Sequence, residues 1–484
     1  MKKLDLLLIY PPEKFRDDGT QGMSPPLGLP YIAAYLLEKG FSVKIIDAPA
    51  EKLSTEDIIE RIKTENPSVL GFTSLTIKFK TNTVESVSKI REAFPDKLIL
   101  IGGHHATVFP QQVIKHNCFD ILIYGEGELT MLELMEKYKM AGCNRKKFLS
   151  DYKTLKQIKG IVFREKNAPV TNEPREFVQD MDDLPFPAME LMPIHLYNPP
   201  PDHYKRLPLF HMIVIRGCPY NCAFCSNNYL FGRRIRKKSP KRVIEEIKNA
   251  VRKFGARDIS FWDDMLTADK QWLTDVCNLL IDEQRNGLDI TWTCFSRVNT
   301  VTPELLKLMK KAGCWGIFYG FESGNQELLD IINKGITLEQ SRNAAKWTQE
   351  AGIDIRASFM IGMPGETKEM ALKTIQFAKE LNTDYPQFCR TSILPGTELF
   401  KMYKQYGRLL IDNEEISEEN CEDIIFFIPW DYKDFNEIRD MERRAIRTCY
   451  FNLKYIFMRL RKLRSIEDIR RNWEGIKRAW EYVS

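Results

Sequence analysis

The chain of 484 residues is longer than a single hydrophobic core usually fills, so its length predicts two or three domains. Hydrophobic residues make up 43% of it and charged residues 28%, a globular composition that excludes a largely disordered protein. The formal net charge of +5 is the small difference between 71 basic and 66 acidic residues, so it neither requires nor excludes an anionic partner.

Eleven cysteines, an odd number in a long chain, indicate reduced thiols and metal ligands rather than the disulfide framework of a secreted protein. The sequence therefore predicts an intracellular protein of the cytoplasm. The apolar start LDLLLIY resembles a signal peptide only briefly and no small-residue cleavage site follows it, so a buried strand explains it better. No run approaches 18 apolar residues, and we expect no membrane-spanning helix.

In the N-terminal part, apolar runs typical of strands alternate with helical stretches. The strand-like runs lie at residues 4–10, 42–47, 68–74, 98–103 and 120–128. This alternation predicts a doubly wound parallel sheet, a Rossmann-like domain over residues 1–145. Ligands of such sheets bind beyond the carboxyl ends of the strands. The residues at those ends include Ser74, Gly103, His104, Gly125 and Glu126.

The amino-acid composition changes after the first domain. Residues 146–205 are mixed and rich in proline, which predicts a linker or an ordered crossing segment. Residues 206–400 contain a second alternating series of about six strands, which predicts a partial or full parallel barrel of the TIM type, with its chemistry at the carboxyl ends of the strands. Residues 401–484 are predicted to be mostly helical.

Three cysteines lie close together in the segment RGCPYNCAFCSNN, at the start of the barrel series. Cys218, Cys222 and Cys225 have the spacing C-x3-C-x2-C, and Pro219 disfavours helical geometry at the first of them, so the sulfurs can converge from a loop. Structural zinc usually takes four ligands, and the next cysteine is distant. A cubane iron–sulfur cluster takes thiolate ligands, and three thiolates around four irons leave one iron open to a small molecule.

The segment CPYNCAFC, with Phe224 before the third cysteine and a barrel-like series after it, resembles the radical SAM superfamily. In that family the three cysteines hold a [4Fe-4S] cluster, and S-adenosylmethionine binds the open iron through its amino and carboxylate groups. Reductive cleavage then gives a 5′-deoxyadenosyl radical that abstracts hydrogen from unactivated carbon. The resemblance implies an external one-electron reductant of the flavodoxin or ferredoxin type and an oxygen-poor environment.

The resemblance also implies contacts to S-adenosylmethionine. In FWDDML, Asp263 and Asp264 are candidates for the methionyl amino group, and because adjacent residues on a strand point opposite ways, we expect only one of them to face the site. In YGFESGNQELL, Glu322 is similar to the family glutamate that reaches S-adenosylmethionine, with Ser323 assisting.

Two further positions match family segments. Arg297 in CFSRVN resembles an arginine that pairs with a carboxylate bidentately, although an exposed ion pair is an equal alternative. Gly362 in FMIGMPGET would allow the backbone to approach the adenine closely.

The N-terminal domain has neither an early G-x-G-x-x-G nor a phosphate loop, which argues against nicotinamide and nucleotide triphosphate binding. Its segments PPLGLPYIAAYL, GFTS, GGHHATVFP and YGEGE together resemble the cobalamin-binding domain of one radical SAM class, and the resemblance spans roughly residues 1–400. It implies that Ser74, Gly103, His104 and Gly125 contact the corrin or its nucleotide tail. The alternatives are that His104 is a polar loop cap and that Gly125 and Glu126 form a turn and a helix start.

The combined resemblance implies an enzyme that cleaves S-adenosylmethionine to a 5′-deoxyadenosyl radical and C-methylates an unactivated carbon through methylcobalamin. The products would be S-adenosylhomocysteine and 5′-deoxyadenosine. One alternative keeps both cofactors but catalyses cyclisation, ring rearrangement or oxidation. An alternative of another class is a zinc-stabilised RNA-binding or RNA-modifying protein, which the small basic surplus disfavours.

Near the C-terminus, apolar residues form one helical stripe while arginines lie largely elsewhere. The stripe consists of Ile446, Cys449, Tyr450, Leu453, Ile456, Phe457, Leu460 and Leu463. A basic amphipathic helix with aromatic residues can lie peripherally on an anionic membrane, which would point to a lipid substrate. The alternative is packing against the barrel, with a small-molecule substrate. We expect no nucleic-acid partner.

Overall fold

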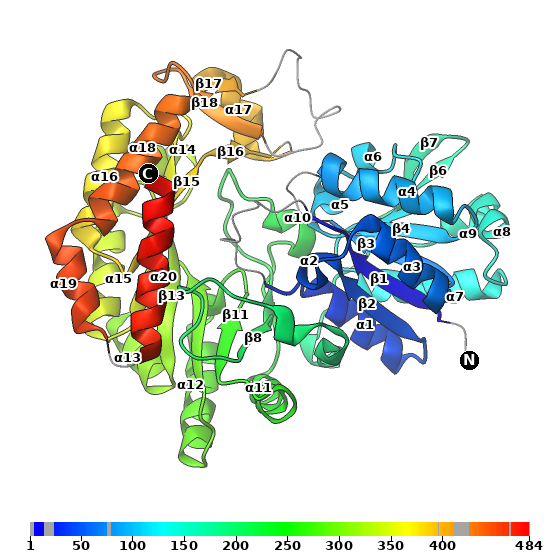
Figure 1. The fold of residues 1–484 in the computed structure, drawn as a ribbon, viewed down its shortest axis with the longest axis horizontal. Helices are drawn as coiled ribbons and strands as arrows, with labels where there is room; N and C mark the ends of the chain where they lie inside the picture. The colour runs from blue at the N-terminus through cyan, green and yellow to red at the C-terminus, as the bar shows by residue number, and fades with distance from the viewer. Residues whose placement is uncertain are drawn as a thin grey trace. The chain divides into compact units, whose positions relative to one another are not determined.

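The computed structural model describes residues 4–13, 24–74, 79–394, 396–410, 425–463 and 466–483. In it the chain forms two compact units (Figure 1). The first contains the described residues up to Asn198 together with the segment Ser226–Gly232, and the second contains Pro199–Cys225 and most of the chain after Arg233. Each unit is built on a largely parallel sheet, so the predicted α/β fold class is confirmed.

The first unit contains a seven-stranded sheet with the order β2-β1-β3-β4-β5-β6-β7. Its parallel strands are β1 (Leu6–Tyr10), β2 (Val43–Asp47), β3 (Val69–Thr73), β4 (Leu98–Gly102) and β5 (Ile121–Ile123). β6 (Ile161–Glu165) and β7 (Ala168–Thr171) extend it antiparallel. These last two strands lie in the segment for which the sequence predicted a linker or crossing segment.

The helices of the first unit lie between its strands and, for the last of them, in the segment Ser226–Gly232. They are α1 (Gly28–Glu38), α2 (Ala48–Glu51), α3 (Thr55–Glu65), a π-helical turn (Phe79–Val84), α4 (Glu85–Ala93), α5 (His104–Val108), α6 (Pro110–Val113), α7 (Glu128–Met140), α8 (Arg145–Ser150), α9 (Tyr152–Leu155) and α10 (Asn227–Phe231). Three 3₁₀ turns follow β7, at Met181–Asp183, Met189–Leu191 and Ile194–Leu196. α3 begins where a capping box predicts it, because Ser54 Oγ accepts from Asp57 N and the Asp57 carboxylate accepts from Ser54 N.

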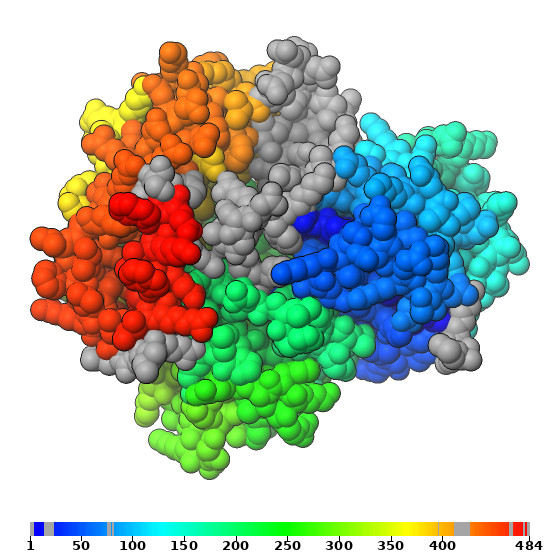
Figure 2. All heavy atoms as spheres, viewed as in Figure 1, coloured from blue at the N-terminus to red at the C-terminus, as the bar shows by residue number. Residues whose placement is uncertain are grey.

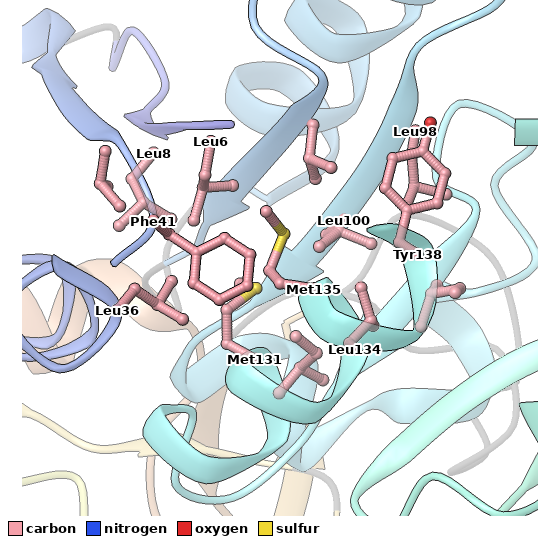
Figure 3. Packing of buried hydrophobic residues seen from close by; sticks show 14 of the residues in the cluster. Leu6, Leu8, Leu36, Phe41, Leu98, Leu100, Met131, Leu134, Met135 and Tyr138 are labelled. Atoms are coloured by element: carbon pink, nitrogen blue, oxygen red, sulfur yellow. The ribbon is translucent and has the colours of Figure 1, made fainter. Parts of the chain in front are cut away.

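The core of this unit lies between the sheet and its helices. All five residues of β1 are buried, as expected for a central parallel strand that is covered on both faces. Figure 3 shows Leu6 and Leu100 of the sheet facing Met131 and Met135 of α7. Because apolar packing occupies both faces, polar groups gather at the carboxyl edge, where the strand order reverses between β1 and β3.

The second unit contains a six-stranded parallel sheet with the order β15-β14-β13-β12-β11-β8. The strands are β8 (Leu209–Met212), β11 (Asp258–Phe261), β12 (Thr291–Ser296), β13 (Cys314–Glu322), β14 (Asp354–Ile361) and β15 (Tyr385–Arg390). β8 and β15 lie at the two edges, so this is the predicted partial barrel. Small antiparallel pairings join β9 (Ile215–Arg216) to β10 (Arg236–Lys237), and β18 (Ile425–Pro429) to β16 (Ser392–Ile393) and β17 (Gly407–Leu409).

Helices cover one face of this sheet (Figure 1). The helices of the series are α11 (Pro240–Phe254), a 3₁₀ turn (Leu266–Ala268), α12 (Lys270–Arg285), α13 (Pro303–Lys311), α14 (Gln326–Ile331), α15 (Leu338–Glu350) and α16 (Lys368–Leu381). On β13, Ile317 and Tyr319 point toward the helices and are fully buried, whereas Phe318 and Gly320 on the other face are half-buried. We call this other face the inner face.

The C-terminal region adds α17 (Glu398–Tyr406), α18 (Phe435–Tyr450), α19 (Leu453–Arg461) and α20 (Ile466–Val483). The sequence predicted one continuous helical stripe over residues 446–463, but the helix breaks after Tyr450, because the Asn452 side chain accepts from Tyr455 N at 2.9 Å and caps a new helix. α18 packs against β15 and α16, and α20 packs against α18. No helix in the described part of the chain is long and apolar enough to cross a lipid bilayer.

Candidate active site

The three motif cysteines lie in the loop that follows β9. All three are half-buried free thiols. Gly217 begins the loop with a φ of 93°, a conformation that favours glycine. Ala223 fixes its centre, because its N–H donates to Ile332 O at 2.8 Å and its carbonyl accepts from Leu399 N at 2.9 Å.

Arg297, directly after β12, lies against this loop. Its Nη1 donates to Cys222 Sγ at 3.3 Å, and its guanidinium stacks on the Tyr220 ring, 3.7 Å from the ring centroid. Its Nη2 donates to the carbonyl of Lys334. The side chain is buried, so the exposed ion pair that the sequence left open does not form. These contacts fix the guanidinium beside the Cys222 sulfur.

Asp263 and Asp264 follow β11 and have different surroundings. Asp263 Oδ1 accepts from the main-chain N–H groups of Val214, at 2.6 Å, and Ile215, between β8 and β9. Its Oδ2 is buried without a hydrogen-bond partner among the described residues, and burial raises the pKa of Asp263 to about 7. Burial and then the neighbouring Asp264 carboxylate raise the pKa of the Cys218 thiol. Asp264 is therefore the member of the pair on the cysteine side.

Glu322 ends β13 and forms a buried ion pair. Lys334 Nζ donates to Glu322 Oε1 at 2.6 Å, and both side chains are at most 8% exposed. Glu322 has a φ of 62°, a left-handed conformation at a register shift in the pairing of β13 with β14. Lys334 Nζ also lies 5.6 Å from the centroid of the Phe224 ring in the cysteine loop. The neighbouring Ser323 hydroxyl bonds Thr374 Oγ1 at 3.1 Å and the main chain of residue 325.

Gly362 follows β14 with a φ of 78°. A side-chain carbon there would lie 3.1 Å from Ile438 of α18, so this position faces a packed helix. Its N–H donates to Glu366 Oε1 at 2.6 Å, which also accepts from the Tyr432 hydroxyl at 2.8 Å. Burial raises the pKa of Glu366 to about 7.

The inner face of the sheet in the second unit carries a row of aromatic rings. The centroids of Trp262 and Phe295 are 6.1 Å apart, and those of Phe295 and Phe318 are 5.2 Å apart. The Arg356 guanidinium, 4.8 Å from the centroid of Phe318, donates to Asp202 Oδ2 at 3.1 Å. This face therefore offers apolar contact beside a neutralised polar group.

In the first unit, Ser74 and Gly103 lie at the carboxyl ends of β3 and β4. Ser74 N donates to Gly102 O at 3.1 Å, which joins the two strand ends. Gly103 has a φ of 96°, and a side-chain carbon there would lie 2.6 Å from Thr73 Oγ1 and 2.8 Å from Ser74 O. Only glycine fits this turn, because the end of β3 occupies the space that a side chain would need. The turn lies at the carboxyl edge, where ligands of such sheets bind.

His104 opens α5 at the same edge. Its Nε2 lies 2.7 Å from Ser226 Oγ, in the segment that clusters with the first unit, and Ser226 directly follows Cys225 in the chain. Burial lowers the pKa of His104, which favours the neutral imidazole. His104 is thus bonded to the residue next to a motif cysteine.

Gly125 and Glu126 form the turn before α7. Gly125 has a φ of 74° and its N–H donates to Thr107 Oγ1 at 3.1 Å. Glu126 Oε2 accepts from Val178 N at 3.1 Å. These contacts are those of a turn and a helix approach, the alternative that the sequence left open.

Sequence reasoning missed a cluster of phenols and carboxyls at the ends of β1 and β2. Tyr10 donates to Glu13 Oε1 at 2.5 Å, and Tyr197 donates to Asp47 Oδ2 at 2.6 Å. Burial raises the pKa of both carboxyl groups. Tyr10 was recognisable as a strand end, but nothing in the sequence connects Tyr197 with Asp47, 150 positions away.

Among the described residues, no three His, Cys, Asp or Glu side chains are arranged as ligands of a single metal ion. The donor set of the loop is three half-buried thiols with a cation against one of them. Thiols are the ligands that iron–sulfur clusters use, so the residues present fit a [4Fe-4S] cluster. Ser74, Gly103 and His104 lie together at the carboxyl edge of the first sheet, which is where large ligands of such sheets bind.

Comparison with known proteins matches two family models to this chain. Residues 212–378 match the model of the radical SAM superfamily, and residues 20–135 match that of the B12 binding domain. An uncharacterized methyltransferase of Pyrococcus horikoshii is 38% identical over 410 residues, which cover 83% of each chain. The anaerobic magnesium-protoporphyrin IX monomethyl ester cyclase of Rubrivivax gelatinosus is 29% identical over 82% of this chain and 69% of its own.

The fold is also that of a solved structure. The radical S-adenosylmethionine methyltransferase TsrM from Kitasatospora setae, solved with cobalamin and a [4Fe-4S] cluster, superposes with a TM-score of 0.71 at 16% identity and covers 93% of this chain and 89% of its own. The cofactors of the protein are therefore a [4Fe-4S] cluster, S-adenosylmethionine and cobalamin. The chain belongs to the cobalamin-dependent radical SAM methyltransferase family.

Proposed function

We propose that this enzyme C-methylates an unactivated carbon of a small molecule with an apolar body. The observation that carries the proposal is the presence, in one chain, of the three-cysteine loop and of a B12 binding domain. A relative of 38% identity that is named a methyltransferase supports it. When bound, the cluster and S-adenosylmethionine supply a hydrogen-abstracting radical, and cobalamin supplies a methyl group.

The residues of this chain would bind the cluster and S-adenosylmethionine and position them. Cys218, Cys222 and Cys225 would hold the cluster, with Arg297 stabilising the charge on Cys222. Asp264, on the cysteine side of its pair, is our candidate for the methionyl amino group.

Glu322 and Phe224 are also candidate contacts to S-adenosylmethionine. Glu322 Oε1 is held by Lys334, which leaves Oε2 as the oxygen that would accept from the ligand. Ser323 and Gly362 would act indirectly, by fixing the ends of β13 and β14. The aromatic row on the inner face supports an apolar substrate.

In the first unit, Ser74, Gly103 and His104 are the candidate cobalamin contacts, and Gly125 and Glu126 would shape the turn beside them. The Tyr10–Glu13 and Tyr197–Asp47 pairs lie at the same carboxyl edge. We propose that these polar groups orient the corrin amides by hydrogen bonding.

A second candidate function is cyclisation or another rearrangement without methyl transfer. The similarity to an anaerobic cyclase over 82% of this chain favours it. Product analysis separates the two. A methyltransferase forms S-adenosylhomocysteine together with 5′-deoxyadenosine, whereas a cyclase forms no S-adenosylhomocysteine.

An external reductant of the flavodoxin or ferredoxin type is part of the proposal, because the radical reaction needs one electron for each cleavage. Contact of the C-terminal helices with a membrane surface is also part of the proposal.

The first experiment is to produce the enzyme without oxygen, with cobalamin supplied, and to measure iron, cobalt and zinc. We expect about four iron atoms and one cobalt per chain. Cys222→Ala should lose the iron, whereas Cys143→Ala, in a half-buried thiol of the first unit, should keep it. Iron without cobalt would overturn methylation, and zinc alone would overturn the radical reaction.

A further inference from the structure

The two C-terminal helices are amphipathic in the reverse sense of an ordinary surface helix. On α19, Tyr455 and Arg459 are buried against the protein. Four apolar residues at positions i, i+3, i+4 and i+7 are exposed instead: Leu453, Ile456, Phe457 and Leu460. Leu453 is 74% exposed and Arg459 only 8%. A helix that packs by hydrophobic burial would show the opposite arrangement.

α20 repeats this arrangement. Among the side chains of α20 that the structure describes, Asp468 and Arg471 are the buried ones, and Arg471 is 4% exposed. The exposed apolar residues follow at positions i, i+4, i+7 and i+11: Ile469, Trp473, Ile476 and Trp480. Trp473 is 69% exposed. Two neighbouring helices with the same inversion indicate a surface that is built to be covered.

Polar contacts hold the helices in this orientation. Arg459 donates to Asp384 Oδ1 at 2.9 Å and to the Tyr385 hydroxyl at 2.7 Å, and the Tyr455 hydroxyl donates to Asp384 O at 2.8 Å. Arg459 Nε also donates to Asn472 Oδ1 at 2.9 Å, which links α19 to α20. The apolar stripes therefore cannot turn inward without breaking buried charge-assisted hydrogen bonds.

A ring contact beside α19 links the two stripes. Phe451, just before α19, is 40% exposed, and its ring packs edge-on against Trp480 of α20 with centroids 5.9 Å apart. We call these nine residues the C-terminal apolar face. Figure 2 shows α20, in red, at the molecular surface. Nine of the 16 exposed large hydrophobic residues of the described chain lie in these 30 positions.

The charge of the segment indicates what covers this face. Residues 453–484 contain nine Lys and Arg and four Asp and Glu, a formal charge of +5, and of these Arg459 and Lys462 pair with Asp384 within the protein. That equals the net charge of the whole chain, so the first 452 residues are electrically balanced. The exposed basic residues include Lys454, Arg461, Arg470 and Lys477. A partner for this segment is therefore apolar at its centre and anionic around it.

We propose that α19 and α20 bind the surface of an anionic lipid bilayer, with the C-terminal apolar face inserted at the level of the headgroups. Tryptophan and phenylalanine favour that depth, and Lys and Arg near the surface attract anionic lipids. The segment lies on the bilayer and does not cross it. A second copy of this chain fits less well, because each copy would bring the same exposed basic residues, Lys454 and Arg461 among them, to the contact.

Vesicle sedimentation with the anaerobically purified holoenzyme tests the proposal. The probes are vesicles of phosphatidylcholine with roughly 30% phosphatidylglycerol, and vesicles of phosphatidylcholine alone. We expect sedimentation with the first, weak sedimentation with the second, and loss of binding in about 0.5 M salt. Equal binding to both vesicles, or to neither, would overturn the anionic bilayer as the partner.

Matched variants assign the binding to this face. Phe457→Ser combined with Trp473→Ser should weaken binding about tenfold or more, whereas Met140→Ser, at an 82% exposed position of the first unit, should leave it unchanged. Lys454→Glu with Arg461→Glu should abolish the preference for anionic vesicles.

A conservative pair guards against misfolding as the cause. Trp473→Phe with Trp480→Phe should keep most of the binding but lose much of the fluorescence quenching by brominated lipids, because tryptophans away from the bilayer are not quenched. Unchanged quenching in this variant would place the contact elsewhere and overturn the proposal.

Sedimentation velocity without vesicles tests the competing occupant. A dimer that Phe457→Ser with Trp473→Ser dissociates would overturn the proposal in favour of self-association. None of these measurements uses catalytic activity, so a bilayer-binding enzyme that does not methylate would contradict only the proposed function.

Discussion

Arg297 donates to the sulfur of Cys222 at 3.3 Å while its guanidinium stacks on Tyr220 of the same loop, at 3.7 Å from the ring centroid. The arginine is thus held by an aromatic residue that the cysteine motif itself contains. A buried cation beside a ligand sulfur would stabilise the more negative, reduced state of a bound cluster more than its oxidised state. Arg297 would therefore raise the reduction potential of the cluster.

We predict that Arg297→Met keeps iron but lowers the reduction potential of the cluster by tens of millivolts, roughly the scale of one lost hydrogen bond and charge. A redox titration followed by electron paramagnetic resonance measures it. Tyr220→Phe keeps the stacked ring and should leave the potential near that of the wild type. A potential unchanged in Arg297→Met would contradict the tuning role.

The ion pair of Lys334 with Glu322 predicts strong coupling in stability. Lys334→Met leaves a buried carboxylate without its partner and should cost about 3–5 kcal/mol of unfolding free energy. The double variant with Glu322→Gln should recover a large part of that loss, because it removes both charges. Thermal unfolding of the four proteins gives the coupling, and additive losses would argue against it.

Glu366 predicts a dependence of stability on pH. Burial raises its pKa from 4.5 to about 7, so the folded state holds its proton more tightly than the unfolded state does. The contribution of Glu366 to the free energy of unfolding is therefore fully present below pH 4.5. It falls by about 3 kcal/mol as the pH rises through 7. Glu366→Gln removes this titration. The stability of the wild type relative to the variant should therefore fall between pH 5 and pH 8, and a constant difference would refute the assignment.

A substitution at Gly103 should impair cobalamin binding and leave the iron–sulfur cluster in place. Gly103→Ala places a side-chain carbon 2.8 Å from Ser74 O in a left-handed backbone, so the edge must distort. We expect the cobalt content to fall about tenfold while iron stays near the wild-type value. Gly28→Ala, where a side-chain carbon meets nothing within 4 Å, is the matched control. Equal loss of iron and cobalt would mean general unfolding.

Periodicity predicted the parallel strands of both sheets because each is a short apolar run followed by a helix with its own end signals. β7 escaped notice because Ala168–Thr171 has only exposed and half-buried residues and includes a proline, so it lacks the apolar pattern of a strand. The break before α19 depends on one capping asparagine inside a continuous apolar stripe.

Some residues of the candidate site were likewise predictable from the sequence, and others were not. The cysteines were predictable because the spacing of their motif is local. Lys334 was not, since only the left-handed turn at Glu322 and the folding of α14 bring its amine to that carboxylate, 12 positions earlier. His104 was singled out, but its partner Ser226, 122 positions later, was not. Pairings of this kind arise from tertiary structure, and single-sequence patterns carry no record of them.

The two main-chain hydrogen bonds of Ala223 have a consequence for cofactor loading. They tie the middle of the cysteine loop to the end of α14 on one side and to the start of α17 on the other, so the loop is ordered by protein alone. Iron would then bind to a loop that already has its folded conformation, and binding would not require the loop to fold. The main-chain amide of Ala223 should therefore exchange its hydrogen slowly in the iron-free protein. The newly synthesised chain should fold before its cluster is inserted.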